Sequence, residues 1–172
     1  MENVIFLAID GVLTPWQACS EKGANSHDPA SINALKQILT DLPHTGLVIM
    51  EGQGMSLRSS RIRARMVDLG IDAARIVGVT PDLRYEVGGN RVHPPRHEEI
   101  RAWLFQNPSV LRYAIIDNAD YREYTGMEDD FFAVEPEIGL TQHIANRVTG
   151  HLIGWQGVMP TNINDSFSWL RG

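Results

Sequence analysis

Residues 4–15 read Val-Ile-Phe-Leu-Ala-Ile-Asp-Gly-Val-Leu-Thr-Pro, an apolar run that meets an acid and then a glycine. Such a run is typical of a buried strand, and the Asp10-Gly11 pair that follows it is typical of a turn. In open parallel sheets, ligands bind beyond the carboxyl ends of the strands. The pattern therefore predicts that Asp10 lies at the edge of a sheet where active sites form, although a strand-end acid can also merely cap turn amides.

The rest of the chain alternates short apolar runs with segments in which apolar residues recur at helical spacing. This alternation predicts an α/β fold with a parallel sheet, helices on both faces and right-handed crossovers. The segment at 16–27 is mixed and contains glycine, which favours a loop or flap. The predicted strands are 46–50, 75–79, 113–117 and 131–134, the predicted helices are 29–41, 56–69, 96–106 and 140–152, and a hairpin is predicted at 85–92.

Length and composition favour one domain in a reducing compartment. At 172 residues the chain suits a single domain at 1–153, with a small insertion at about 71–95 and an irregular tail at 154–172 packed by its aromatics. The single cysteine, Cys19, excludes an intramolecular disulfide framework. No apolar run approaches the roughly 20 residues that span a bilayer. These features predict a cytoplasmic protein with no membrane association.

The net charge of −6 argues against a protein that coats nucleic acid through bulk electrostatics, but it leaves room for a local basic face. Arg58, Arg61 and Arg65 recur at helical spacing within 56–69. Because that helix would begin near the carboxyl edge, Arg58 is a candidate to contact a phosphate or an RNA end. The alternative is a solvated basic face paired with nearby acids.

A second predicted strand, 113–117, also ends in an acid, Asp117, followed by Asn118 and Asp120. The carboxyl ends of parallel strands meet at one edge, so Asp117 and Asp10 are expected there together. Asn118 and Asp120 are candidates for the same site. They are equally well explained as polar residues that favour the start of a helix.

The order of these segments resembles the haloacid dehalogenase (HAD) superfamily, and more narrowly the HAD domain of Swiss Army Knife RNA repair proteins. The matching segments are IDGVL at 9–13, RHEEIRAWL at 96–104, AIIDNAD at 114–120 and GLT at 139–141. The resemblance covers residues 4 to about 152 and implies a three-layer α/β sandwich with a Rossmann-like parallel sheet and little or no cap. It also implies a phosphatase-type hydrolase that acts on a phosphorylated small molecule or a nucleic-acid end.

The resemblance further implies roles for individual residues. In such enzymes one Asp attacks phosphorus, an Asp two residues later is the general acid and base, and Mg²⁺ neutralises the phosphate. Asp10 matches the acid/base position and would offer its backbone carbonyl to the metal. Asp117 matches the metal-binding acid, with Asn118 and Asp120 as further ligands, and Arg96 matches the cation that steadies the phosphate.

Two positions depart from that pattern. The nucleophile's position holds Ala8, whose methyl group can neither form an aspartyl-phosphate nor ligate Mg²⁺. The second strand leads into Met50-Glu51-Gly52, where the family places a hydroxyl side chain. Glu51 would repel a phosphate unless a metal or proton intervened, or it is simply a loop acid; Gly52 would let backbone amides approach a ligand, or it is a flexible connection.

These departures leave two functional hypotheses. The first is a phosphatase-type domain that is inactive or redirected as written, in effect a pseudoenzyme. The second is a non-catalytic module that binds a ligand, a metal or a protein on the same fold. An engineered Ala8 would explain the first departure only, whereas natural loss or redirection of the activity explains both.

Overall fold

The structure is a computed structural model that describes residues 2–22, 27–50 and 59–154. Three of the candidate residues, Glu51, Gly52 and Arg58, lie outside the described residues. So does the predicted tail, apart from Gly154.

A five-stranded parallel sheet in the order β3-β2-β1-β6-β7 forms the centre of the molecule. The central strand β1 therefore has a neighbour on each side, and its residues from Val4 to Leu7 are fully buried. This arrangement confirms the predicted parallel sheet. The strands are β1 (Asn3–Leu7), β2 (Thr45–Ile49), β3 (Ile76–Val79), β6 (Arg112–Asp117) and β7 (Phe131–Ala133).

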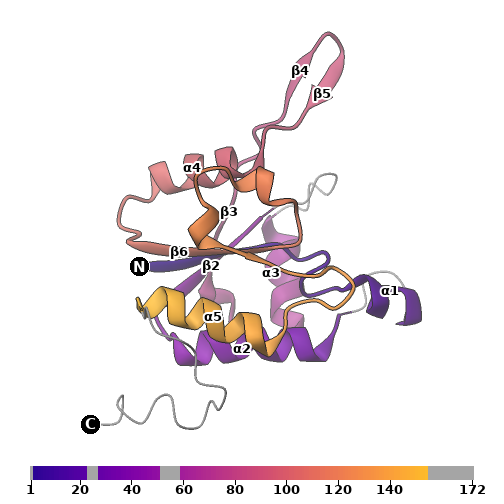
Figure 1. The fold of residues 1–172 in the computed structure, drawn as a ribbon, viewed down its shortest axis with the longest axis vertical. Helices are drawn as coiled ribbons and strands as arrows, with labels where there is room; N and C mark the ends of the chain where they lie inside the picture. The colour runs from indigo at the N-terminus through magenta and orange to yellow at the C-terminus, as the bar shows by residue number, and fades with distance from the viewer. Residues whose placement is uncertain (1, 23–26, 51–58, 155–172) are drawn as a thin grey trace.

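Helices cover both faces of the sheet and complete a three-layer sandwich (Figure 1). On one face lie α2 (Pro29–Asp41), α3 (Ser59–Asp68) and α5 (Gln142–Ile153), and α4 (Arg96–Gln106) lies on the other. Three short 3-10 helices are η1 (Ala73–Arg75), η2 (Tyr121–Tyr124) and η3 (Glu128–Asp130). The fold is therefore the predicted α/β, Rossmann-like sandwich.

An antiparallel hairpin of β4 (Tyr85–Val87) and β5 (Asn90–Val92) projects from the body beyond α4 (Figure 1). It lies where the sequence placed a small insertion. The neighbouring strand β3, which falls in the same stretch of sequence, belongs to the main sheet.

The longer helices form where capping and apolar spacing agree. Asp28 accepts a hydrogen bond from the backbone nitrogen of Ser31 at 2.8 Å and caps α2, with Pro29 in the first turn. Thr141 caps α5 in the same way through Ile144, at 3.3 Å. Gly154 ends α5 in the left-handed conformation, with φ of 76°.

The prediction of a loop across 16–27 is wrong for its first part, because Trp16–Lys22 forms the helix α1. The helix follows Pro15, and the backbone nitrogen of Trp16 donates to the carbonyl of Pro136 at 2.8 Å. Trp16, the first residue of α1, is 56% exposed.

The β1 strand packs against α4 through aromatic edges. The ring centroids of Phe6 and Trp103 are 5.5 Å apart, and the two ring planes lie at 88°. For Phe6 and Tyr113 the centroid distance is 5.9 Å and the interplanar angle is 81°. Edge-to-face rings at this spacing add to the hydrophobic gain of burial. Trp103 is buried.

The loop before α5 depends on a glycine. Gly139 has φ of +84°, and a Cβ there would lie 2.5 Å from Ser31 Oγ and 2.9 Å from the carbonyl oxygen of Val12. We expect Gly139→Ala to lower the free energy of unfolding by about 2–3 kcal/mol, because backbone strain and overpacking add. Urea denaturation measures the change. Gly88→Ala is the matched control: Gly88 also has positive φ, but nothing lies within 4 Å of its Cβ position. Equal losses in both variants would contradict the packing part of the argument.

Candidate active site

Ala8 and Asp117 lie side by side where β1 and β6 end. Leu7 pairs with Ile116, and the backbone nitrogen of Ala8 donates to the carbonyl of Ile116 at 3.0 Å, so the ladder continues past the strand. Phe6 and Tyr113 share the face of the sheet that α4 covers, because their rings touch. Side chains alternate along a strand. Ala8 and Asp117 therefore share that same face.

The Asp117 carboxylate is fully buried and surrounded by donors. Its Oδ1 accepts from the backbone nitrogen of Asn118 at 2.8 Å and, in the amide orientation that satisfies both groups, from the Asn118 side chain at 3.0 Å. Its Oδ2 accepts from the Tyr124 hydroxyl and lies 3.3 Å from Arg96 Nη1. A carboxylate offers about four lone-pair sites; three of them accept hydrogen bonds here, and the Arg96 charge faces Oδ2.

Tyr124 is a site residue that the sequence reasoning missed. Burial, followed by the charge of Asp117, raises the pKa of the Tyr124 hydroxyl far above its ordinary value. The group therefore stays protonated and donates to Asp117. Tyr124 ends η2 and stacks on Phe131 with centroids 4.4 Å apart. The available signal was Asp120, which caps η2 through the backbone nitrogen of Arg122 at 2.9 Å.

Arg96 begins α4, and its backbone nitrogen donates to Glu123 Oε2 at 3.1 Å. The side chain is 17% exposed and forms the cationic partner of Asp117. At 3.3 Å this contact is an ion pair without hydrogen-bond geometry, since Nη1 has no hydrogen-bond partner among the described residues. Arg96 thus balances the charge of Asp117, and its buried Nη1 faces that carboxylate.

Asp10 lies in the tight loop after β1, with an exposed carboxylate that accepts from Thr14 Oγ1 at 3.3 Å. In the amide orientation described above, the Asn118 side chain also donates to the Asp10 carbonyl, at 3.2 Å. Gly11 makes this contact compatible with the fold, because a Cβ there would lie 2.4 Å from the Asn118 side chain. The loop and Asn118 are therefore locked together.

The structure thus gathers five of the predicted residues: Ala8, Asp10 through its carbonyl, Asp117, Asn118 and Arg96. It does not bring Asp120 to them. Asp120 is exposed and bound to Arg122 Nη2 at 2.7 Å, and this hydrogen bonding lowers the pKa of Asp120 to about 2.

The described donors do not fit the Mg²⁺ that the resemblance implied. Ala8 supplies no oxygen, both Asp117 oxygens already accept from protein donors, and the Asp10 carbonyl faces an amide nitrogen. Among residues 2–22, 27–50 and 59–154, no group of three or more His, Cys, Asp or Glu side chains is placed to hold a metal ion. Hard cations need several free oxygen ligands. The positive charge of Arg96, and not a metal ion, balances the negative charge of Asp117 in this structure.

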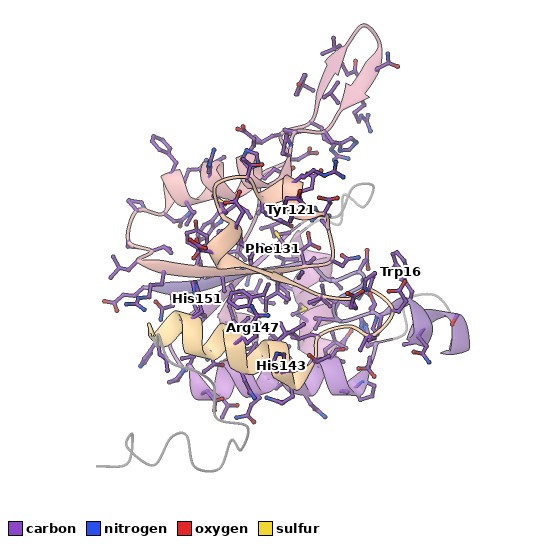
Figure 2. The ribbon with its side chains drawn as sticks, viewed as in Figure 1. Trp16, Tyr121, Phe131, His143, Arg147 and His151 are labelled. Atoms are coloured by element: carbon purple, nitrogen blue, oxygen red, sulfur yellow. The ribbon has the colours of Figure 1, made fainter. Side chains whose placement is uncertain are left out.

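A second polar cluster lies elsewhere, on α5. His143, Arg147 and His151 follow one another along this helix (Figure 2). His151 Nε2 lies 2.9 Å from Asp130 Oδ1 and 3.1 Å from the Tyr113 carbonyl, near the start of β6. Arg147 lies over the Phe132 ring at 5.4 Å. These contacts hold α5 near the amino ends of β6 and β7, away from the carboxyl ends where the candidate site lies.

Comparison with known proteins identifies the fold's family. Residues 4–145 match the family model described as the HAD domain in Swiss Army Knife RNA repair proteins. No curated protein and no solved structure matched the chain. No helix within the described part of the chain is long and apolar enough to cross a membrane. The match spans most of the sequence and every strand of the main sheet, so this chain belongs to the family of HAD domains found in Swiss Army Knife RNA repair proteins.

Proposed function

We propose that this HAD-like, phosphatase-type domain binds a phosphate group at the carboxyl edge of its sheet and forms no aspartyl-phosphate. The observation that carries the proposal is the pairing of Ala8 with Asp117. The position beside the buried acid offers a methyl group, and the acid's charge is balanced by Arg96. The covalent route needs an attacking carboxylate at position 8, so it is closed to this sequence.

The site can still bind a phosphate group without a carboxylate at position 8. The Arg96 side chain is 17% exposed, and its guanidinium carries donors besides the buried Nη1 that faces Asp117. Cationic donors of this kind recognise phosphate oxygens. The family's description names RNA repair proteins, which makes a phosphorylated nucleic-acid end the first ligand to test and a phosphorylated small molecule the second.

A binding assay and a turnover assay test this proposal together. Fluorescence anisotropy should show that the domain binds a 5′- or 3′-phosphorylated RNA oligonucleotide more tightly than the same oligonucleotide without the phosphate. With Mg²⁺ and a generic phosphate ester, the natural sequence should give no turnover above the blank. Equal affinity for both oligonucleotides would contradict the binding half of the proposal.

Restoring the nucleophile tests how much of the family's machinery remains. We expect Ala8→Asp to give Mg²⁺-dependent turnover of the phosphate ester, because the new carboxylate adds the oxygen that the site lacks for Mg²⁺, and Asp10, Asp117 and Arg96 match the remaining catalytic positions. Ala8→Asn is the matched control, since it has the same size and no nucleophilic carboxylate. If the two variants hydrolyse the ester equally slowly, the rest of the site has also diverged and the domain is a binding module only.

A redirected hydrolase is the second candidate. The exposed Asp10 carboxylate favours it, since a general base for water must be accessible. In that case the natural sequence would hydrolyse a phosphate ester directly, and Asp10→Asn would abolish the reaction. Turnover by the natural sequence that Asp10→Asn removes would therefore replace the binding proposal with this one.

A further inference from the structure

A cavity of about 260 Å³ lies on the hairpin formed by β4 and β5. Pockets that enclose a whole small molecule are typically about 300–1,000 Å³, so this cavity suits a single chemical group of a larger ligand. Its lining among the described residues is Asp82, Arg84, Tyr85, Glu86 and Arg91.

Two of the lining side chains are opposite charges that face each other across the hairpin. Glu86 and Arg91 are directly paired in the antiparallel register, so their side chains lie on the same face. The tight turn at Gly88-Gly89, where both residues have positive φ, fixes this register. Both side chains are exposed, and neither makes a hydrogen bond or an ion pair with another residue in the described part of the chain. The cavity thus offers a carboxylate acceptor beside a guanidinium donor.

The other two charges in the lining are paired with each other. Arg84 Nε donates to Asp82 Oδ1 at 2.6 Å, and Arg84 Nη2 pairs with Asp82 Oδ2. These hydrogen bonds lower the pKa of Asp82 to about 2, so the acid is ionised near pH 7. The described lining therefore carries two negative and two positive charges and has no net charge. Such a cavity favours an uncharged group with both donors and acceptors over a phosphate.

Glu99 connects the hairpin with the candidate active site. The backbone of Leu83 hydrogen-bonds the Glu99 carboxylate, which lies one turn after Arg96 on α4. Burial raises the pKa of Glu99, and the charges of Arg96 and Arg84 oppose that rise. Arg96 and Arg84 therefore lie near the same carboxylate, and the cavity is near the start of α4. A strand held by a phosphate at Arg96 can place a neighbouring group at the hairpin.

Guanine matches the open pair of charged groups better than the other bases do. Its N1–H and N2–H are adjacent donors that one carboxylate accepts together, and its O6 and N7 are adjacent acceptors for one guanidinium. Adenine, cytosine and uracil lack this combination of two adjacent donors and two adjacent acceptors. Tyr85 is 53% exposed and also lines the cavity, which favours a planar group because bases stack on aromatic side chains.

We propose that the hairpin cavity binds a guanine base next to the phosphorylated end of a nucleic-acid strand. Glu86 accepts from guanine N1–H and N2–H, and Arg91 donates to O6 and N7. The assignment rests on the proposed function and deepens it, because it names the base beside the phosphate that Arg96 contacts.

Fluorescence anisotropy with single-stranded oligouridine tests the cavity. Each probe carries a terminal 5′- or 3′-phosphate and either guanosine or adenosine as the terminal nucleotide. The natural sequence should bind the guanosine probe about tenfold or more tightly, the discrimination expected of a good bidentate pair. Glu86→Ala should remove most of this preference. Glu137→Ala is the matched control, since it removes an exposed acid outside the hairpin and should leave the preference unchanged.

Modified bases separate a direct contact from a structural role of the hairpin. Inosine lacks the N2 amino group, so the natural sequence should bind an inosine probe more weakly than the guanosine probe, whereas Glu86→Ala should bind both equally. 7-Deazaguanosine lacks N7, and Arg91→Ala should likewise abolish the difference between it and guanosine. A residue that only stabilises the hairpin would weaken binding of every probe by the same factor, and that result would contradict the proposed contacts.

The outcomes stay distinct from those of the proposed function, because each comparison changes one group of the probe. A preference for the phosphorylated strand with equal affinity for guanosine and adenosine would overturn the guanine site and leave phosphate binding intact. Equal affinity with and without the phosphate would instead contradict phosphate binding at Arg96. Should Glu86→Ala fail to fold, as circular dichroism would reveal, the modified probes still test the natural sequence. Equal binding of guanosine, inosine and 7-deazaguanosine would then overturn the proposal.

Discussion

Replacing Asp117 with alanine is expected to lower the free energy of unfolding by about 3–5 kcal/mol, the usual cost of removing one partner from a buried ion pair. Asp117 is fully buried, and its loss leaves the Arg96 charge and the Tyr124 hydroxyl without their acceptor. Urea denaturation followed by circular dichroism measures the change. A shift in the midpoint without a change in slope would assign it to stability.

Two variants control this experiment. Asp120→Ala makes the same chemical change at an exposed acid paired with Arg122, and it should alter stability only slightly. Asp117→Ala combined with Arg96→Met removes both charges and should recover part of the loss, because no unpaired charge remains. If Asp117→Ala costs no more than Asp120→Ala, the buried pair does not stabilise the fold as described.

The fold was predictable where local signals and burial agree. Residues 29–41 carry a cap, a first-turn proline and apolar spacing, and the helix α2 has the predicted bounds. The apolar runs before Asp10 and Asp117 are strands because they are buried on both faces, as in most parallel sheets. Helix α1 escaped prediction, since a proline and one backbone hydrogen bond hold its start.

The sequence predicted only those site residues that lie at the end of a strand or at the start of a helix. Asp117 and Asn118 are placed by the register of β6, and Arg96 by the start of α4, which are local features of the sequence. Tyr124 reaches Asp117 through a 3-10 turn. Such contacts depend on tertiary packing, which no periodicity encodes.

The saturation of Asp117 was also beyond sequence reasoning. An acid in this position of the family pattern indicates a metal ligand, but whether its oxygens are free depends on the neighbours that the fold supplies. Here a tyrosine and an asparagine donate hydrogen bonds, and an arginine supplies the balancing charge. We infer that Ala8 and the Arg96 pair belong together, because a single carboxylate needs only one compensating charge, whereas two adjacent carboxylates need more.

Ala8→Asp is therefore expected to make the stability of the domain depend on magnesium. Position 8 is 5% exposed and lies beside the buried Asp117, so the new carboxylate would enter a site with one cation for two negative charges. In EDTA the variant should be about 2–4 kcal/mol less stable than the natural sequence, since burying an unbalanced charge is costly. Millimolar Mg²⁺ should restore most of this loss by binding only the folded state.

The pH dependence of stability distinguishes the effect of the new charge in Ala8→Asp from the effect of the larger side chain. Burial next to Asp117 would raise the folded-state pKa of the introduced carboxylate above its unfolded value of about 3.9. The unfolded state then releases this proton first, so in EDTA the penalty should be small below pH 4 and should grow as pH rises through the folded pKa. Ala8→Asn, with the same size and no charge, should show neither the magnesium response nor this pH dependence. Thermal unfolding of the three proteins in EDTA and in Mg²⁺ distinguishes them. A magnesium response in the natural sequence would mean that Arg96 yields Asp117 to the metal, and it would contradict the assignment of Arg96 as the cation of this site.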